Sequence, residues 1–178
     1  MKKQVGSKSS FLRRYLPEFV YGGMDGSVTT FAVVAGSIGA SLSSVVVLIL
    51  GFANLFADGF SMAVANYVST KSRNELDGKN RKNEKKTAFA TFFAFLLVGL
   101  IPLLSFVLAA ITNNANLIQN QFKYSIILTG LAFIVVGWFR GDVTGRPKVK
   151  AALETFTIGT IASLLAFAVG HFLKTIIG

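Results

Sequence analysis

Residues 25–72 read DGSVTTFAVVAGSIGASLSSVVVLILGFANLFADGFSMAVANYVSTKS, and this stretch decides the fold. Two long apolar runs are separated by the short uncharged turn 40–43, which predicts an antiparallel pair of membrane-spanning helices. Asp25 and Asp58 lie inside these runs. A carboxylate near the middle of a bilayer costs roughly 2.5 to 3.5 kcal/mol even on lenient insertion scales, so it persists where something uses or neutralises it. We interpret that partner as a cation.

The whole chain is far more apolar than a soluble domain. It has 178 residues, of which 52% are hydrophobic and 15% are charged, and its mean hydropathy is +0.59. These values predict an integral membrane protein. The net charge of +10 would favour a nucleic-acid partner in a soluble chain, but here the basic residues lie between apolar runs, so we expect none. Because the chain has no cysteine, disulfides and thiolate metal sites are excluded.

The hydropathy pattern predicts an all-α integral membrane protein with five transmembrane helices, since each span needs roughly 20 apolar residues. A basic cytoplasmic N-terminal segment, residues 1–18, precedes a transmembrane domain, residues 19–178. The predicted spans are residues 19–40, 44–69, 88–111, 122–139 and 151–177, with cytoplasmic connectors at residues 70–87 and 140–150. Pro102 falls inside the third span, where neighbouring helices can accommodate a kink.

The basic residues predict the orientation of the chain in the membrane. Of the 18 Lys and Arg residues, 16 lie in the N-terminal segment and the two connectors. Basic loops face the cytoplasm, so we expect a cytoplasmic N-terminus and, after five spans, a C-terminus on the opposite side. The expected location is a plasma or inner membrane in a prokaryote, and a vacuolar or other organelle membrane in a eukaryote.

A ladder of metal-ligating side chains is predicted on the second span. Its members recur at intervals of four, which places them on one helix face; they are Asn54, Asp58, Met62 and Asn66. Carboxylate and amide oxygens suit Mg²⁺, Ca²⁺ or Mn²⁺, whereas a thioether favours Fe²⁺ and its later neighbours. A first-row divalent metal fits the mixture best. Met62 taken alone could equally be a gap-filling core side chain.

Small residues surround the acid of the first span. Gly22 and Gly26 have the GxxxG spacing that allows close helix approach, by a second chain or by the second span, although they could serve packing only. Asp25 itself could bind the cation, or it could be a capping or neutralised carboxyl near the cytoplasmic end. Carboxylates clustered in a low dielectric can hold a proton when metal is absent and release it when metal arrives, which predicts proton-coupled exchange.

Two further acids lie near the predicted cytoplasmic boundary. Glu154, at the start of the fifth span, either completes a carboxylate set with the two aspartates or lies in the head-group zone beside Lys148 and Lys150. Glu18, next to Pro17, is predicted to be interfacial.

The chain lacks the sequence signatures of common enzymes, and we predict that it is not one. It has no GxxxxGK[ST], HExxH or GxSxG motif. Two membrane aspartates could form the shared-proton dyad of an intramembrane aspartyl protease. That family usually has YD and GxGD motifs across about nine spans, whereas this chain has GMDG and FADG in five.

The motifs of residues 25–72 resemble the vacuolar iron transporter family, also called the Ccc-type iron and manganese transporters. DGxxTTFAxVAG, ADGFSM and YxSxKS occur in order, and residues 145–170 are more loosely similar to the last span of the family. The resemblance implies a homodimer with its transport path between the subunits, and it places Asp25 and Met62 at intramembrane metal positions. It also implies export from the cytoplasm driven by protons moving the other way.

Two departures from the family pattern are present. Plant and parasite members carry a glutamate one turn after the methionine, where this chain has Asn66; Asp58 and Glu154 are candidates to supply that acid instead. Many members insert a glutamate-rich cytoplasmic metal-binding domain between spans two and three, but here the connector is short and mostly basic. The chain therefore resembles a short form of the family.

These patterns together predict a transporter that moves Fe²⁺, or Mn²⁺, out of the cytoplasm in exchange for protons. The metal is the transported substrate, so we expect no cofactor. The candidate metal ligands are Asp25, Asp58, Met62, Asn54, Asn66 and, more weakly, Glu154. The alternatives are a non-transporting membrane scaffold or assembly protein, a passive cation channel and an intramembrane protease.

Overall fold

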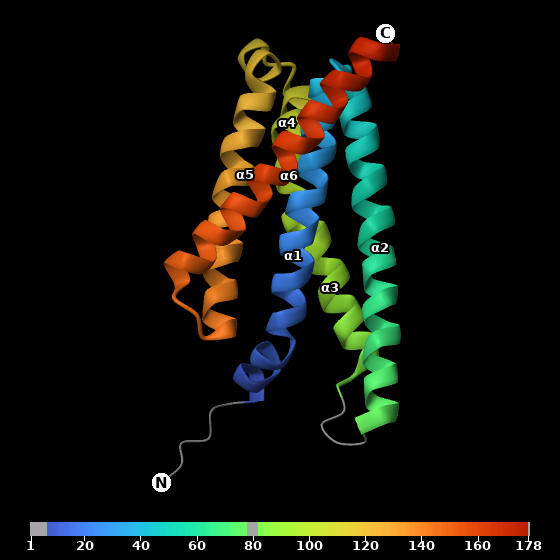
Figure 1. Ribbon diagram of the computed structural model, residues 1–178, viewed down its shortest axis with the longest axis vertical. Coiled ribbons are helices and arrows are strands. Elements are labelled where there is room, and N and C mark those ends of the chain that lie inside the picture. The colour runs from blue at the N-terminus through green and yellow to red at the C-terminus, as the bar shows by residue number, and fades with distance from the viewer. Residues whose placement is uncertain (1–6, 78–81, 178) are drawn as a thin grey trace.

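The computed structural model describes residues 7–77 and 82–177, and every regular element in these ranges is a helix. The helices run up and down in one elongated bundle, with the start of α1 and the end of α6 at opposite ends (Figure 1). In chain order they are α1 (Ser7–Gly39), α2 (Ser44–Asp77), α3 (Glu84–Gly99), the 3-10 helix η1 (Ile101–Leu103), α4 (Leu104–Thr112), α5 (Ala115–Thr144) and α6 (Lys148–Ile177). The predicted all-α class is confirmed.

Four helical segments in the described part of the chain are long and apolar enough to cross a membrane. They are Ser44–Leu76, Glu84–Thr112, Ala115–Thr144 and Lys148–Ile177. These segments contain four of the five predicted spans and support a multi-pass membrane protein. The remaining predicted span, residues 19–40, lies almost entirely in α1, which has the length but not the required apolar composition.

The position of α1 explains its composition. This helix contacts α2, α3, α5 and α6, and it runs through the middle of the bundle in Figure 1. Neighbouring helices therefore cover much of its surface, and small residues that permit close packing replace large apolar ones.

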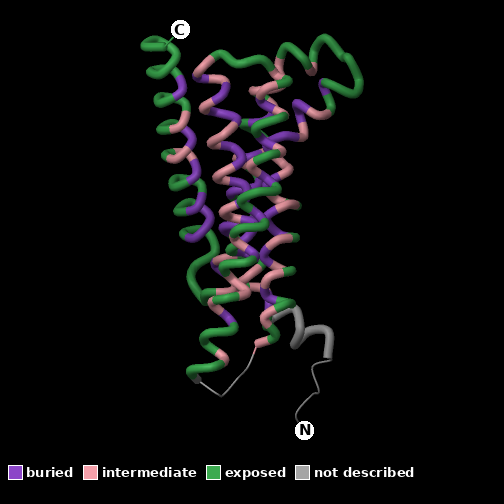
Figure 2. Tube along the Cα trace, turned by 90° about the vertical axis from the view of Figure 1, so that its right-hand side faces the viewer, coloured by how far each residue is buried: buried purple, intermediate pink, exposed green. Residues whose placement is uncertain are grey.

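The exposed surface is rich in large apolar side chains, and the interior holds many small polar ones. Exposed examples are Ile49, Phe60, Ile134, Leu164 and Phe172, and buried examples are Thr87, Thr91, Ser125, Thr155 and Ser163. Figure 2 shows buried residues on the inward side of the helices and exposed residues outside. This distribution suits a protein whose outer surface faces lipid, because only the interior can satisfy polar groups.

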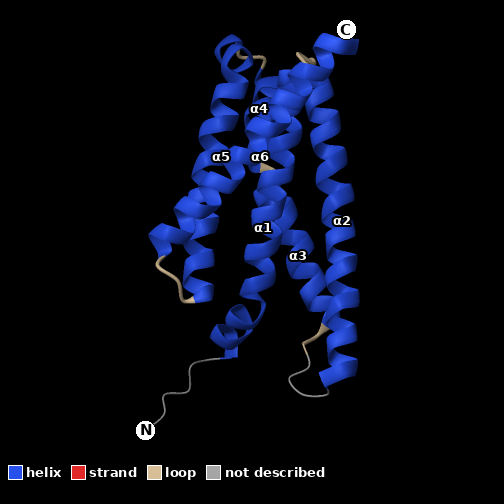
Figure 3. Ribbon diagram, viewed as in Figure 1, coloured by secondary structure: helices blue, strands red, loops and turns tan. Residues whose placement is uncertain are grey.

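The helices extend into both predicted connectors (Figure 3). Residues 70–87 are helical over most of their length, and Asn83 caps α3 by accepting a backbone N–H of its first turn at 3.0 Å. The connector 140–150 is reduced to residues 145–147, where Gly145 ends α5 with a φ of 66°. Lys, Arg and Glu are good helix formers, so the charged segments continue the helices.

Pro102 interrupts the third span, as predicted. It lies in η1, which separates α3 from α4. The Ser125 hydroxyl of α5 donates to the Pro102 carbonyl oxygen at 2.6 Å, and the Ser105 hydroxyl donates to the Gln121 carbonyl oxygen at 2.7 Å. Side chains thus tie the broken span to α5 and satisfy backbone groups near the break.

The glycines of α1 mediate close helix packing, but the helix that approaches them is α3. A Cβ added at Gly26 would lie 2.5 Å from the carbonyl oxygen of Phe95, and a Cβ at Gly22 would clash with the carbonyl of Thr91. The second span, expected as one element that could come near Asp25, does so through Asp58, while α3 packs on the two glycines. The α1–α3 contact fixes the register of α1 and so the height of Asp25 in the bundle.

Candidate functional site

Asp25 and Asp58 are brought together from α1 and α2. Their carboxylates lie close enough for the two charges to interact. Asp25 is half-buried, whereas Asp58 is exposed on the surface of the single chain. The hydroxyl of Thr29, one turn after Asp25, donates to the backbone carbonyl oxygen of Asp25 at 2.9 Å and not to its carboxylate. Two carboxylates from neighbouring helices thus lie near enough to influence each other electrostatically.

The ladder residues of α2 lie in different environments along the helix. Asn54 is half-buried, and its Nδ2 is buried with no hydrogen-bond partner in the described part of the chain. Met62 is also half-buried. The Nδ2 of Asn66 donates to Oγ1 of Thr91 on α3 at 2.6 Å, and Thr91 in turn donates to the Thr87 carbonyl oxygen at 3.0 Å. The amide oxygen of Asn66, the atom that could bind a metal, takes no part in this bond.

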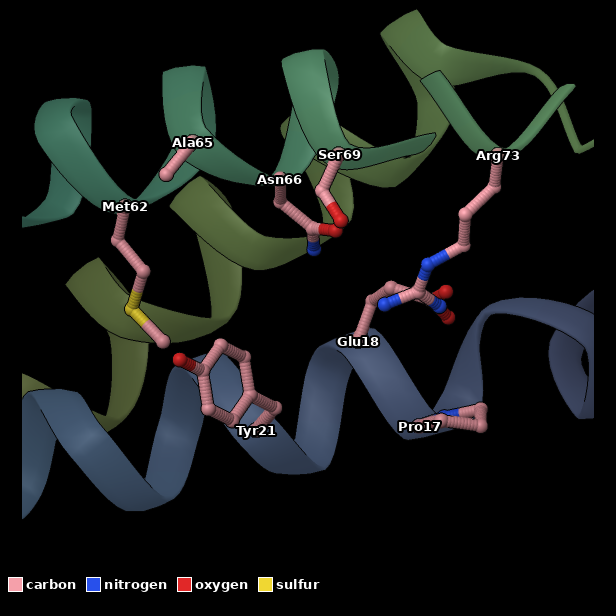
Figure 4. A pocket seen from close by; sticks show the side chains of 8 residues that line it. All are labelled: Pro17, Glu18, Tyr21, Met62, Ala65, Asn66, Ser69 and Arg73. Atoms are coloured by element: carbon pink, nitrogen blue, oxygen red, sulfur yellow. The ribbon is translucent and has the colours of Figure 1, made fainter. Parts of the chain in front are cut away.

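A cavity of about 360 Å³ lies between α1 and α2 (Figure 4). Its lining residues are Pro17, Glu18, Tyr21, Met62, Ala65, Asn66, Ser69 and Arg73. Two predicted ladder residues, Met62 and Asn66, therefore reach a space large enough for an ion with several waters. Met62 and Asn66 thus line the cavity, whereas Asp58, one helical turn before Met62, is not among its lining residues.

Glu18 is the functional candidate that the sequence interpretation missed. Its side chain is only 11% exposed, and its Oε1 lies 2.7 Å from Nζ of Lys82. Its second oxygen, Oε2, is buried and has no hydrogen-bond partner among the described residues. The Glu18 side chain thus lies inside the bundle, and its interfacial depth in the membrane stays a prediction. The signal was present in the spacing, because Glu18 precedes Asp25 by seven residues, which is two helical turns on one face.

Glu154 pairs with one arginine of α5 and with one in the connection between α5 and α6. Its Oε2 lies 3.2 Å from Nη1 of Arg140 and 4.0 Å from Nη1 of Arg146. Lys148, one of the two lysines expected near it, pairs with Asp142 at 2.8 Å. These contacts occupy Glu154 at the α5–α6 junction, and its role as a metal ligand stays a prediction.

Among the described residues, no group of three or more His, Cys, Asp or Glu side chains is arranged to hold a metal ion. One chain instead offers carboxylates from α1 and α2 that are interspersed with amide and thioether groups. Such a set can accompany a moving ion, because weak, successive sites release what they bind.

A family model described as the VIT family matches residues 16–87 and 77–171. The chain belongs to the VIT family. The two matched segments meet at the α2–α3 connection of this VIT-family chain, where many members were expected to carry an inserted domain. The resemblance inferred from the motifs is confirmed.

Relatives of this VIT-family chain cover most of its length. A Plasmodium berghei (strain Anka) protein named vacuolar iron transporter is 26% identical over 90% of this chain and 83% of its own length. Two Arabidopsis thaliana proteins are similar as well. Vacuolar iron transporter 1 is 24% identical over 84% of this chain and 82% of its own length, and vacuolar iron transporter homolog 4 is 30% identical over 94% and 89%.

The alignment with the Plasmodium berghei protein shows that the relative is longer within the matched region. It runs over 226 positions, although this chain has only 178 residues. The Arabidopsis thaliana homolog 4 aligns over 186 positions, much closer to the length of this chain. The VIT-family chain described here is therefore a short member.

Proposed function

We propose that this VIT-family chain moves divalent iron, or manganese, out of the cytoplasm in exchange for protons. The observation that carries the proposal is the electrostatic interaction of Asp25 of α1 with Asp58 of α2, one helical turn before Met62, which lines the cavity between these helices. Metal transport is further supported by relatives that are named vacuolar iron transporters.

The charges of the two aspartates match a divalent cation. Two carboxylates and one M²⁺ ion form a neutral unit, which lowers the cost of placing the ion in a low dielectric. When the ion leaves, two adjacent negative charges remain and repel each other. Proton uptake removes that repulsion, so metal release and proton binding are coupled at the same groups.

The transporting unit is proposed to be a homodimer in which α2 faces its copy. Asp58 is exposed in the single chain, and its neighbours Phe56 and Phe60 are exposed as well. A carboxylate on a lipid-facing surface is costly, so we infer that protein covers it. Small exposed residues recur every fourth position beside it and would allow close approach of a second α2; they are Ala53, Ala57, Ser61 and Ala65.

The proposed topology has five spans, with α1 as the first and the N-terminus in the cytoplasm. The covered, central position of α1 supports its inclusion, and the basic residues of both connectors support the orientation.

The decisive experiment is metal-dependent proton flux in proteoliposomes. Fe²⁺, Mn²⁺, Co²⁺ and Zn²⁺ are compared with wild type, Asp25→Asn and Asp58→Asn, and Glu75→Gln serves as a matched control because Glu75 is an exposed acid at the far end of α2. We expect each aspartate variant to lower the initial rate at least about tenfold, whereas the control stays within about twofold. Normal transport by both aspartate variants would contradict the proposed site.

An applied pH gradient distinguishes a proton exchanger from a passive channel, because only the exchanger can use it to accumulate metal. An exchanger accumulates metal against its own gradient when protons flow the other way, whereas a channel only dissipates the metal gradient. Metal movement with no pH change would refute proton exchange and favour a channel.

The dimer can be tested on the same preparation because the chain has no native cysteine. Ala57→Cys on α2 should form a disulfide-linked dimer in the membrane, and Ile161→Cys on α6, which is also exposed, should not. Equal cross-linking at both positions would argue against an interface along α2.

A further inference from the structure

We propose that Lys82 is a tethered cation that neutralises Glu18 in the absence of metal and is displaced when a divalent ion enters the cavity beside it. The proposal rests on the proposed function, because it assigns the cavity between α1 and α2 to the transported metal. The observation behind the proposal is the ion pair between these two residues. Nζ of Lys82 lies 2.7 Å from Oε1 of Glu18, and the Glu18 side chain is only 11% exposed.

The Glu18 carboxylate is only half satisfied by Lys82. Its Oε2 is buried and lacks a hydrogen-bond partner among the described residues, although a buried carboxylate oxygen ordinarily has one. Glu18 also lines the 360 Å³ cavity with Asn66 and Ser69, whose oxygens suit a hard or borderline divalent cation. The geometry therefore leaves an acceptor that a metal ion can use and that the ammonium does not.

The backbone of Lys82 is fixed independently of its side chain. Its N–H donates to Oδ1 of Asn74 at 3.2 Å, and its carbonyl oxygen accepts from Nδ2 of Asn74 at 2.7 Å. Lys82 is 35% exposed along its side chain, so the ammonium has a route to water. Release is thus a side-chain movement, and the tether keeps the ammonium near enough to return when the metal leaves.

Charge balance makes the two cations exclude each other. Glu18 and Lys82 together are neutral, but an added divalent ion would give the pair a net charge of about +2, with Arg73 lining the same cavity. Repulsion then favours movement of Lys82 into solvent. By linkage, Lys82 must weaken metal binding by the same factor by which metal weakens the Lys82–Glu18 pair.

The first test measures Mn²⁺ binding to the full chain in detergent by titration calorimetry. Lys82→Gln should bind Mn²⁺ about tenfold more tightly, because the competing charge is gone. Lys85→Gln is the matched control, since Lys85 is an exposed lysine three residues along that lines other cavities, and its affinity should stay within about twofold of wild type. In a Glu18→Gln background, Lys82→Gln should produce no further gain. Unchanged or weaker binding by Lys82→Gln overturns the proposal.

The second test uses unaltered protein and so does not depend on a variant that folds. The rate of Lys82 acetylation by an amine-reactive reagent is measured by mass spectrometry with and without saturating Mn²⁺, and Lys85 is the internal reference. We expect Mn²⁺ to raise the Lys82 rate several-fold without changing the Lys85 rate. A Lys82 rate that is unchanged or lowered by Mn²⁺ overturns the tethered-cation proposal.

The two proposals can fail separately. Wild-type transport together with metal-independent Lys82 acetylation refutes the tethered cation and leaves the transport function standing. Absence of transport together with Mn²⁺-accelerated acetylation refutes the transport proposal and supports displacement of Lys82.

Discussion

The sharpest stability prediction concerns Gly26, where α1 packs against α3. A Cβ added at this position would lie 2.5 Å from the carbonyl oxygen and 3.0 Å from the Cα of Phe95, and both are backbone atoms that cannot rotate away. In Gly26→Ala the two helices would have to separate by about 1 Å to restore ordinary contacts. Overpacking of this kind costs about 2 to 3 kcal/mol of unfolding free energy, which should lower the melting temperature by about 5 to 10 °C for a chain of this size.

The control for this prediction is Gly130→Ala on α5. A Cβ there would meet only Cε2 of Phe156, at 3.4 Å, which is an ordinary contact. Alanine is also favoured over glycine inside a helix, so this variant should be neutral or more stable by about 0.5 to 1 kcal/mol. Both variants and wild type are compared by thermal unfolding in the same detergent. If Gly26→Ala has the same melting temperature as wild type while Gly130→Ala has a lower one, the close-packing argument is refuted.

Three further predictions concern the broken span, the α5–α6 ion pair and the bound metal. Ser125→Ala removes the hydroxyl that donates to the Pro102 carbonyl oxygen at 2.6 Å; it should cost about 1 kcal/mol and lower the melting temperature by about 3 °C, and an unchanged melting curve would contradict this. Glu154→Gln breaks a half-exposed pair with Arg140 that is worth at most about 1 kcal/mol. We therefore expect its transport rate in proteoliposomes to remain well above that of Asp58→Asn, and an equal loss in the two variants would favour Glu154 as a metal ligand. Saturating Mn²⁺ at about 100 times its dissociation constant should stabilise wild type by about 2.7 kcal/mol in thermal unfolding; the same gain in Asp58→Asn would exclude Asp58 as a ligand.

Helical periodicity made much of the fold predictable. All five predicted spans lie within helical segments apart from Ala40 at the end of the first and Leu100 at the break in the third. Hydropathy alone did not show how far the helices run beyond the apolar spans: α2 and α3 extend into residues 70–87, whose charged residues have good helix propensity. The composition of α1 also has a tertiary cause, since a helix covered by its neighbours does not need a continuous apolar surface.

The candidate site was predictable only where its residues share one helix. Spacing placed Asp58, Met62 and Asn66 on a single face of α2, and two of them line the cavity there. Glu18 could have been linked to Asp25 by the same rule, but its pairing with Lys82 joins residues 64 positions apart. Contacts at such separation depend on how the helices pack, and a single sequence does not specify that packing.

The sequence by itself determined the helical membrane class, the family and the presence of two aspartates inside apolar runs, because hydropathy, periodicity and motif spacing are local properties. Tertiary structure decided which surfaces meet. It set α3 against the glycines of α1, brought Asp58 beside Asp25, paired Glu154 with Arg140 and buried Glu18 beside Lys82. The physical reason is that periodicity defines the face of a helix, while its neighbour is chosen by close packing and charge balance across the whole bundle.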